Sequence, residues 1–89
     1  MSRRVITSDN VLAHEFEEEA VILNLDNETY YRFNGIAMDM WQALTNNDSV
    51  DAARAQLLEQ YDVEEAELTK DLDTFIQLIV DAQLAVVQD

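Results

Sequence analysis

The side chains from which this sequence could build a catalytic centre are one histidine, His14, and nineteen acidic residues. A Ser–His–Asp triad would need His14, which stands beside Glu15 in a predicted strand. The chain has no cysteine for a Cys–His pair, and Gly35 alone cannot supply the glycine-rich loops that hold phosphates. We therefore expect His14 to be a structural strand histidine, and the protein to be no enzyme and to use no cofactor.

Two acidic groupings have the chemistry to bind a hard cation. Glu17 to Glu19 are consecutive, and Asp71 and Asp73 are separated by one residue. Neither grouping follows the spacing of an EF-hand loop. On a helix, Asp71 and Asp73 would point about 160° apart and could not chelate one ion together. We expect solvated charge at both places and no metal site.

The residues best suited to binding lie in the stretch TYYRF, Thr29 to Phe33. Side chains alternate along a strand, so Tyr31 and Phe33 share one face and Tyr30 and Arg32 share the other. Helices follow this strand, so we expect Tyr31 and Phe33 in the core and the other two at the surface. At a sheet edge the backbone of this strand would be a template for an added strand. A proline at Tyr31 would test whether that amide faces the added strand.

Three short strands must position this stretch. Charged or polar turns at Glu17–Glu19 and Asp26–Glu28 separate runs of strand composition. The pattern predicts a three-stranded antiparallel meander with its last strand at an edge and with Leu12, His14 and Phe16 on one face. Residues 1–10 show no periodicity and are expected to be loose. The predicted strands are Val11–Phe16, Ala20–Leu25 and Thr29–Phe33.

Helical periodicity begins after the third strand. Asn34 is a candidate N-cap for the first helix, in which Trp41 is expected in the core with Ile36, Ala37, Met40 and Leu44. Ser49 is expected to cap a second helix, whose apolar stripe is Val50, Ala53, Leu57 and Tyr61. Asp62 and Glu65 resemble a capping box for a third helix from about Glu64 to Gln83. Leu84 to Val87 is predicted to be a short strand or a tucked tail.

The apolar face of the third predicted helix is unusually wide. At 100° per residue it covers roughly 200°, against about 100° for an ordinary core-facing helix. It is centred on Leu68, Leu72, Phe75, Ile79 and Ala82, with Ile76 and Val80 on one flank and Leu78 on the other. Either the helix is buried between two other elements, or a partly open groove runs beside it.

The charge narrows the choice of partners. Nineteen acids face five bases, which gives a net charge of −14. Such a surface repels nucleic acid and anionic lipid and favours a basic or neutral partner, although it could also serve solubility alone. No apolar run approaches the ~18 residues that a membrane span needs. We expect one α+β domain over residues 1–89, with no nucleic-acid or membrane partner, and a cytoplasmic location.

The order of these motifs resembles the PqqD-like family, to which coenzyme PQQ synthesis protein D belongs. LNLDNETYYRFN, a helix with Trp41, SVDAARAQLLEQYDV and DLDTFIQLIVDAQL follow the family pattern over roughly Val11 to Val87. Phe33 stands where leucine is common, and the glycines usual before the second helix and after the third are absent. The matching positions are Tyr31, Phe33, Asn34, Met40, Trp41, Leu44, Ser49, Val50, Leu57, Tyr61, Val63, Leu72, Phe75 and Leu78.

The resemblance implies a winged-helix-like fold, a three-stranded antiparallel meander followed by three helices. It also implies a recognition element for ribosomally made, modified peptides. Such a domain binds the leader of a precursor as a strand added to the third strand, beside the third helix, and presents it to a modifying enzyme or leader peptidase. The Tyr-Tyr strand is more similar to stand-alone members from lasso-peptide clusters than to the PQQ protein.

The residues that the resemblance implies for peptide binding come from two elements. The strand would supply backbone pairing, the helix apolar pockets, and Asp71 a charge contact. The alternative is a structural or oligomerising domain that uses the same edge to form a homodimer. The implied peptide-binding residues are Thr29, Tyr30, Tyr31, Arg32, Phe33, Leu68, Asp71, Leu72, Phe75 and Ile76.

Overall fold

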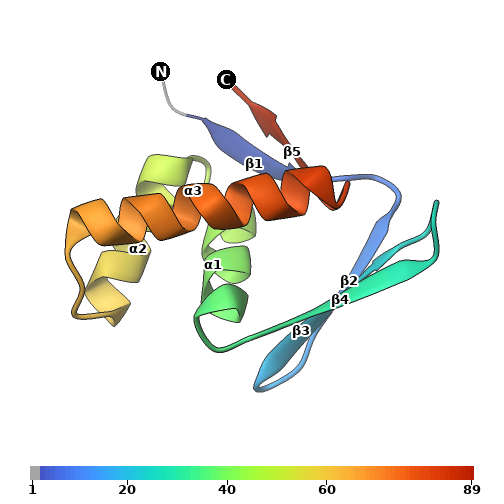
Figure 1. Cartoon of the computed structure of the whole chain (residues 1–89), viewed down its shortest axis with the longest axis horizontal. Helices are drawn as coiled ribbons and strands as arrows, with labels where there is room; N and C mark the ends of the chain where they lie inside the picture. The colour runs from blue at the N-terminus through green and yellow to red at the C-terminus, as the bar shows by residue number, and fades with distance from the viewer. Residues whose placement is uncertain (1–2) are drawn as a thin grey trace.

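The computed structural model describes residues 3–89 and contains two small antiparallel sheets and three helices. Strands β2, β3 and β4 form one sheet in that order, and β1 pairs with β5 in the other (Figure 1). The predicted fold class, a three-stranded antiparallel meander followed by three helices, is confirmed. The elements are β1 (Arg4–Thr7), β2 (Val11–Glu15), β3 (Glu19–Asn24), β4 (Thr29–Asn34), α1 (Gly35–Asn46), α2 (Val50–Gln60), α3 (Glu65–Asp81) and β5 (Ala85–Gln88).

The segment before β2 corrects the expectation that residues 1–10 are loose. Arg4 to Thr7 form β1, whose register with β5 runs from Arg4 opposite Gln88 to Thr7 opposite Ala85. Val50 N–H also donates to the Arg3 carbonyl at 2.7 Å. Four residues are too few to show a period, and their partner lies at the far end of the chain, so no local pattern indicates this strand. Met1 and Ser2 lie outside the described residues. Of the two predictions for Leu84 to Val87, the strand is correct.

The core joins the three-stranded sheet to the helices through aromatic rings. Trp41 is 1 % exposed, and its ring centroid lies 5.9 Å from that of Phe33. Phe33 in turn meets Phe75 of α3 edge to face, with centroids 5.1 Å apart. Ile22 from β3 is fully buried beneath them. The prediction that Trp41 and Phe33 are core residues is confirmed, and Tyr31 packs half-buried against the same cluster.

The ends of the helices differ in part from the predicted caps. Ser49 caps α2 as expected, with its Oγ accepting from Ala52 N at 3.0 Å. Asn34 occupies the N-cap position of α1, but its side chain makes no capping hydrogen bond. The capping box at Asp62 and Glu65 is wrong, because Glu64 is the N-cap of α3 and makes no side-chain cap.

Ile36, expected in the apolar face of α1, is 41 % exposed. Helix α1 instead buries Met38, which lies on the opposite flank of the Trp41 face. Within residues 3–89, none of the helices combines the length and the apolar composition needed to cross a membrane.

Candidate functional site

The last strand of the meander, β4, is an edge strand, as the sequence predicts. Its register with β3 places Ala20 opposite Phe33, Ile22 opposite Tyr31 and Asn24 opposite Thr29. Its other side has no neighbouring strand in the described part of the chain. Figure 1 shows β4 leading directly into α1.

Two hydrogen bonds on the other side of β3 determine which backbone groups of β4 are free. Leu25 N donates to the Asn10 carbonyl at 2.8 Å, and Phe16 N donates to the Glu19 carbonyl at 2.7 Å. Antiparallel pairs alternate between hydrogen-bonded and non-bonded residues. The odd-numbered residues of β3 therefore turn their backbone groups toward β2, and the even-numbered ones turn theirs toward β4.

The same alternation orients the backbone of β4. Thr29, Tyr31 and Phe33 stand opposite even-numbered residues of β3, so their N–H and C=O groups face β3. The N–H and C=O groups of Tyr30 and Arg32 point outward from the sheet. The condition on which the proline test at Tyr31 depends is therefore not met, because the Tyr31 amide belongs to the existing ladder.

The side chains of β4 divide as the sequence predicts. Phe33 is buried among the helices, whereas Tyr30 is 62 % exposed on the opposite face. Arg32 is also exposed, and its Nη2 lies 3.1 Å from both carboxylate oxygens of Glu19. This hydrogen bond, with the charge of Glu19, raises the pKa of Arg32. The guanidinium is thus already occupied by a partner from β3.

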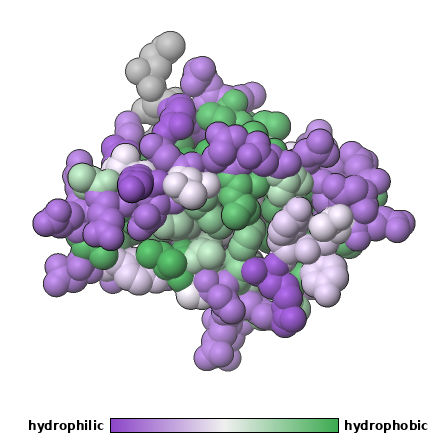
Figure 2. Space-filling model, in the orientation of Figure 1, coloured by the Kyte–Doolittle hydropathy of each residue, from purple (hydrophilic) through white to green (hydrophobic). Residues whose placement is uncertain are grey.

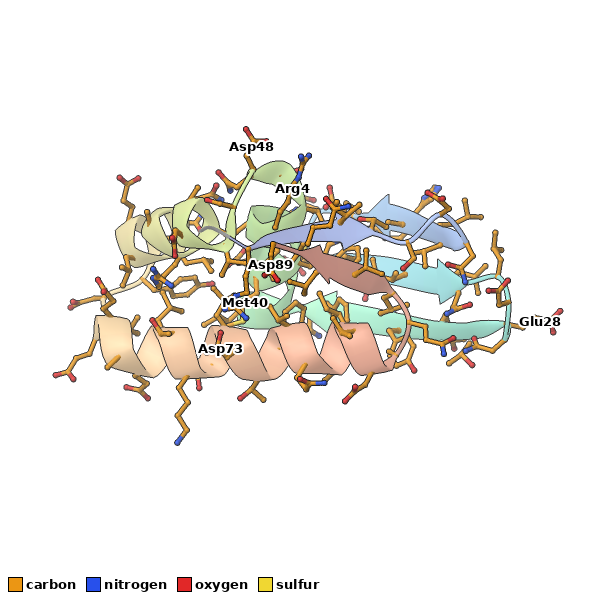
Figure 3. The ribbon with its side chains drawn as sticks, turned by 90° about the horizontal axis from the view of Figure 1, so that it is seen from above. Arg4, Glu28, Met40, Asp48, Asp73 and Asp89 are labelled. Atoms are coloured by element: carbon orange, nitrogen blue, oxygen red, sulfur yellow. The ribbon has the colours of Figure 1, made fainter. Side chains whose placement is uncertain are left out.

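In Figure 3, seen from above, β4 lies next to α3, and in Figure 1 the strand slopes away below the helix. Two contacts fix how the helix is rotated. Phe75 faces β4 through its contact with Phe33, and Asp73 Oδ1 accepts from Arg3 Nη2 at 3.0 Å on the other side. On the flank nearest β4, Asp71 and Leu78 lie about 40° and 60° beyond Phe75, away from the core. Both are exposed, Leu78 to 46 %.

This rotation separates the predicted α3 site residues into two groups. Phe75 and Asp71 lie on the flank that borders β4. Leu68 and Leu72 are 1 % exposed in the core, and Ile76, 4 % exposed, lies about 100° from Phe75 on the side away from β4. The wide apolar face is therefore mostly buried between other elements, which was the first of the two alternatives.

Leu78 is the residue that sequence reasoning missed as a candidate for binding. Its position on the flank of the helix was visible in the sequence, but which flank meets β4 was not. The contact between Phe33 and Phe75 supplies that information. Figure 2 shows the molecule from the side seen in Figure 1. Apolar surface gathers in the middle of this view, below α3, with hydrophilic residues around it.

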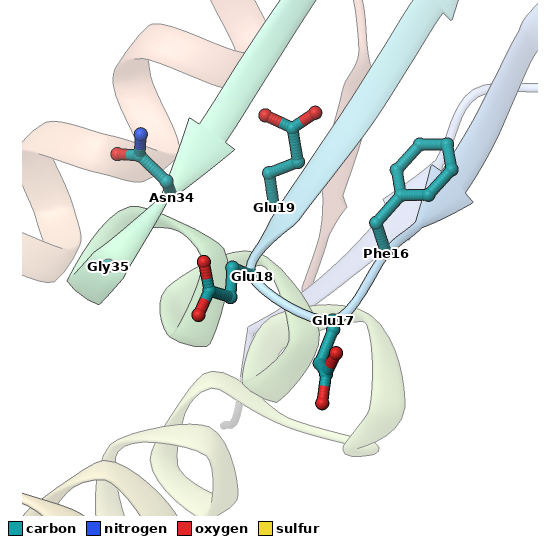
Figure 4. Close-up of a pocket in the computed structure, with 6 residues that line it drawn as sticks. All are labelled: Phe16, Glu17, Glu18, Glu19, Asn34 and Gly35. Atoms are coloured by element: carbon teal, nitrogen blue, oxygen red, sulfur yellow. The ribbon is translucent and has the colours of Figure 1, made fainter.

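Two hollows of the surface lie away from α3. One, of about 580 Å³, is lined by Phe16, the acidic run Glu17–Glu19, Asn34 and Gly35 (Figure 4). The three carboxylates diverge there, and no cluster of metal-ligating side chains is found among residues 3–89. Glu17 and Glu18 form the charged turn that the sequence predicts, whereas Glu19 begins β3 and pairs with Arg32. The outer face of the sheet carries a second hollow, of about 330 Å³.

The only histidine lies on the outer face of the sheet. His14 is exposed in β2, and its ring centroid is 5.9 Å from that of Phe16. The prediction that it stands in a strand is confirmed.

Comparisons with known proteins give one family and two similar folds. The family described as coenzyme PQQ synthesis protein D (PqqD) matches residues 19–85. A structure described as "TbiB1 in Complex with the TbiA(beta) Leader Peptide" has a TM-score of 0.84 and 22 % identity, covering 89 % of this chain and 92 % of that one. "Lasso peptide synthetase B1 complexed with the leader peptide" has a TM-score of 0.80 and 17 % identity, covering 97 % and 99 %. No curated protein sequence matches the chain.

Proposed function

Because the chain belongs to the PqqD family, we propose that it is a non-catalytic adaptor that binds the leader of a ribosomally made precursor peptide. The leader adds to β4 as a further strand, beside α3. Both similar folds are of proteins complexed with leader peptides, which supports this assignment. The adaptor presents the bound leader to a modifying enzyme or leader peptidase of the same pathway. Its proposed location is the cytoplasm, where ribosomes make the precursor.

The observation that carries this proposal is the free outer edge of β4. The outward N–H and C=O groups of Tyr30 and Arg32 can each pair with an added strand. Six residues of β4 provide an edge of about 20 Å, enough for a leader segment of about the same number of residues.

Helix α3 supplies the other wall of the proposed site. Side chains of the leader that point toward the helices meet Leu78, which is 46 % exposed, and the edge of Phe75, which is 8 % exposed. Those beside Asp71 meet a negative charge. We therefore expect a leader with an apolar residue next to a lysine or arginine. A leader with acids at these positions should bind more weakly.

Proline substitutions at the two edges of the sheet test this function. Arg32→Pro removes an outward amide of β4 and places a ring where the added strand would lie, so leader affinity should fall at least about tenfold. Ala13→Pro is the matched control, since by the same alternation its amide points outward from the opposite edge, β2. Arg32→Ala controls for the lost side chain and its bond to Glu19.

The measurement is isothermal titration calorimetry with synthetic leaders. The probes are leader segments of short precursors encoded beside the gene of this chain, with the TbiA(beta) leader as a second probe. Circular dichroism confirms that each variant is folded. An equal loss in Ala13→Pro, or unchanged binding in Arg32→Pro, would contradict strand addition at β4.

The homodimer remains the second candidate, because a free edge can also pair with the β4 of another copy. Sedimentation over a range of concentrations separates the two. A monomer at every concentration removes this alternative, whereas a dimer that Arg32→Pro dissociates would favour it.

A further inference from the structure

The outer face of the β2–β3–β4 sheet carries large apolar side chains that the fold does not bury. Leu12, Leu23 and Tyr30 form one row across all three strands, because Leu12 stands opposite Leu23 and Leu23 opposite Tyr30. Leu12 and Phe16 are each 55 % exposed, and Tyr30 is 62 % exposed. We call this row, together with Phe16 and Val21, the outer apolar face.

This arrangement departs from the usual pattern of a sheet that packs on one side only, because apolar residues lie on both of its faces. Such sheets turn apolar residues to the core and polar residues to water. Ala13 and Glu15 of β2 lie on the helix side of the sheet, whereas Leu12 of β2 and Phe16, which follows the strand, point away from it. Together with His14, Val21 and Leu23, these two side chains line a hollow of about 330 Å³. Exposed apolar residues that gather in one patch mark an interaction surface.

Acidic turns stand at both ends of the outer apolar face. The turn after β2 has Glu17 and Glu18, both exposed, and the turn after β3 has Asp26 and Glu28. About six strand residues separate the two turns, which corresponds to about 20 Å. Arg32, the basic residue of these strands, is paired with Glu19. The rim of this face is therefore negative.

The net charge also distinguishes between two possible occupants of the outer apolar face, a second copy of this chain and a different protein. A second copy of this chain would bring two outer apolar faces together with their acidic turns, each copy carrying a net charge of −14. Like charges across an interface oppose association. A different protein, with an apolar centre and basic residues at either side, matches the face in both polarity and charge.

We propose that the outer apolar face docks a partner protein through an apolar surface flanked by lysine or arginine residues. The docking chemistry does not depend on the proposed function. The identification of this partner as the enzyme that receives the leader does rest on it. Tyr30 belongs to both surfaces, because its backbone points outward at the β4 edge and its side chain lies on the outer face. A leader strand added to β4 would widen the sheet that the partner contacts.

The first test uses two amphipathic helical peptides as probes, each about four turns long. One contains only leucine and lysine, and the other has glutamate in place of every lysine. In ¹⁵N-labelled protein, the leucine–lysine peptide should bind saturably and shift the amides of β2, β3 and Tyr30. Saturable binding centred on α3 or β5, binding of both peptides with equal affinity, or no saturable binding would overturn the proposal.

Paired variants show whether the side chains carry the binding. The double substitution Leu12→Ser with Phe16→Ser should lower the affinity for the leucine–lysine peptide at least about tenfold. Val63→Ser with Val86→Ser removes two exposed apolar side chains elsewhere, 40 % and 49 % exposed, and should change affinity less than about twofold. Equal effects of the two pairs would overturn the proposal.

Two controls separate this surface from its alternatives. The Leu12→Ser, Phe16→Ser variant should still bind a leader that the unaltered chain binds, so failure of docking is distinguishable from failure of leader binding. Sedimentation of the unaltered chain should show a monomer. A dimer that this variant dissociates would assign the face to a second copy and overturn the partner proposal.

Discussion

A single buried amide joins the sheet to the end of α3. Asn24 is fully buried, and its Nδ2 donates to the carbonyls of Ala82 and Gln83 at 3.4 and 3.2 Å. Its Oδ1 accepts from Asp26 N at 2.9 Å and so also shapes the turn between β3 and β4. Because β4 begins at the end of this turn, one side chain helps to place the proposed peptide-binding edge beside the helix.

Asn24→Ala should lower the free energy of unfolding by about 1–3 kcal/mol, because it leaves buried groups without their partners. Urea denaturation followed by circular dichroism measures the loss. Asn27→Ala is the matched control, since Asn27 is exposed and its Oδ1 accepts only within the turn, from Thr29 N at 3.0 Å. It should cost less than about 1 kcal/mol. Similar losses in both variants would contradict a special role for Asn24.

At the scale of elements, two left-handed residues define the boundaries of helices α1 and α3. Gly35, with φ of 56°, makes the junction between β4 and α1. Gln83, with φ of 62°, ends α3 in a Schellman motif. In that motif, Gln83 N donates to the Val80 carbonyl at 3.0 Å and Leu84 N to the Ile79 carbonyl at 2.9 Å. A glycine would adopt this conformation without strain, yet the sequence has glutamine here.

Gln83→Gly should therefore raise the free energy of unfolding by about 0.5–1 kcal/mol, because it relieves left-handed strain of a non-glycine residue. Gly35→Ala should lower it by about 1 kcal/mol. A Cβ at Gly35 would meet nothing within 4 Å, so its cost is the backbone conformation alone. Thermal and urea unfolding of both variants measure these changes. Opposite signs are expected, and a destabilised Gln83→Gly would contradict the argument.

At the scale of the whole molecule, the charge works against compactness. The net charge of −14 lies on a chain whose Cα radius of gyration is 12.5 Å. Repulsion between exposed carboxylates destabilises the folded state and is screened by salt. The ion pairs found among residues 3–89 lie at the surface, such as Arg3 with Asp73, and contribute little to stability.

Raising NaCl from about 0.02 M to about 0.5 M should therefore raise Tm by about 4–8 °C, equivalent to about 1 kcal/mol for a domain of this size. Differential scanning calorimetry at neutral pH measures the change. Replacing Glu17, Glu59 and Glu67 with glutamine should reduce the salt response. A Tm that salt leaves constant would show that self-repulsion is unimportant here.

Local patterns in the sequence were sufficient to predict much of this fold. Alternation along Thr29 to Phe33 predicts which side chains face the core, and helical periodicity predicts the burial of Trp41 and Leu44. The Ser49 cap follows from a residue preference that acts over three positions. These features depend on neighbours along the chain, so the sequence displays them directly. The assignment of residues 1–89 to one domain stays a prediction.

Contacts between segments far apart in the sequence could be identified only from the tertiary structure. The pairing of β1 with β5 joins the two ends of the chain. Phe75 of α3 contacts Phe33 of β4, although α1 and α2 lie between them in the sequence. That contact shows which flank of α3 borders β4, and so adds Leu78 to the proposed site. Ile76 lies on the other side of the helix, and Leu68 and Leu72 are buried in the core, so the proposed site does not include these three. The hydrogen-bonding register of β3 with β4 turns the amides of Tyr30 and Arg32 outward, whereas the amide of Tyr31 faces β3. The sequence determined the faces of each element, but their rotation and register depend on packing that no local pattern encodes.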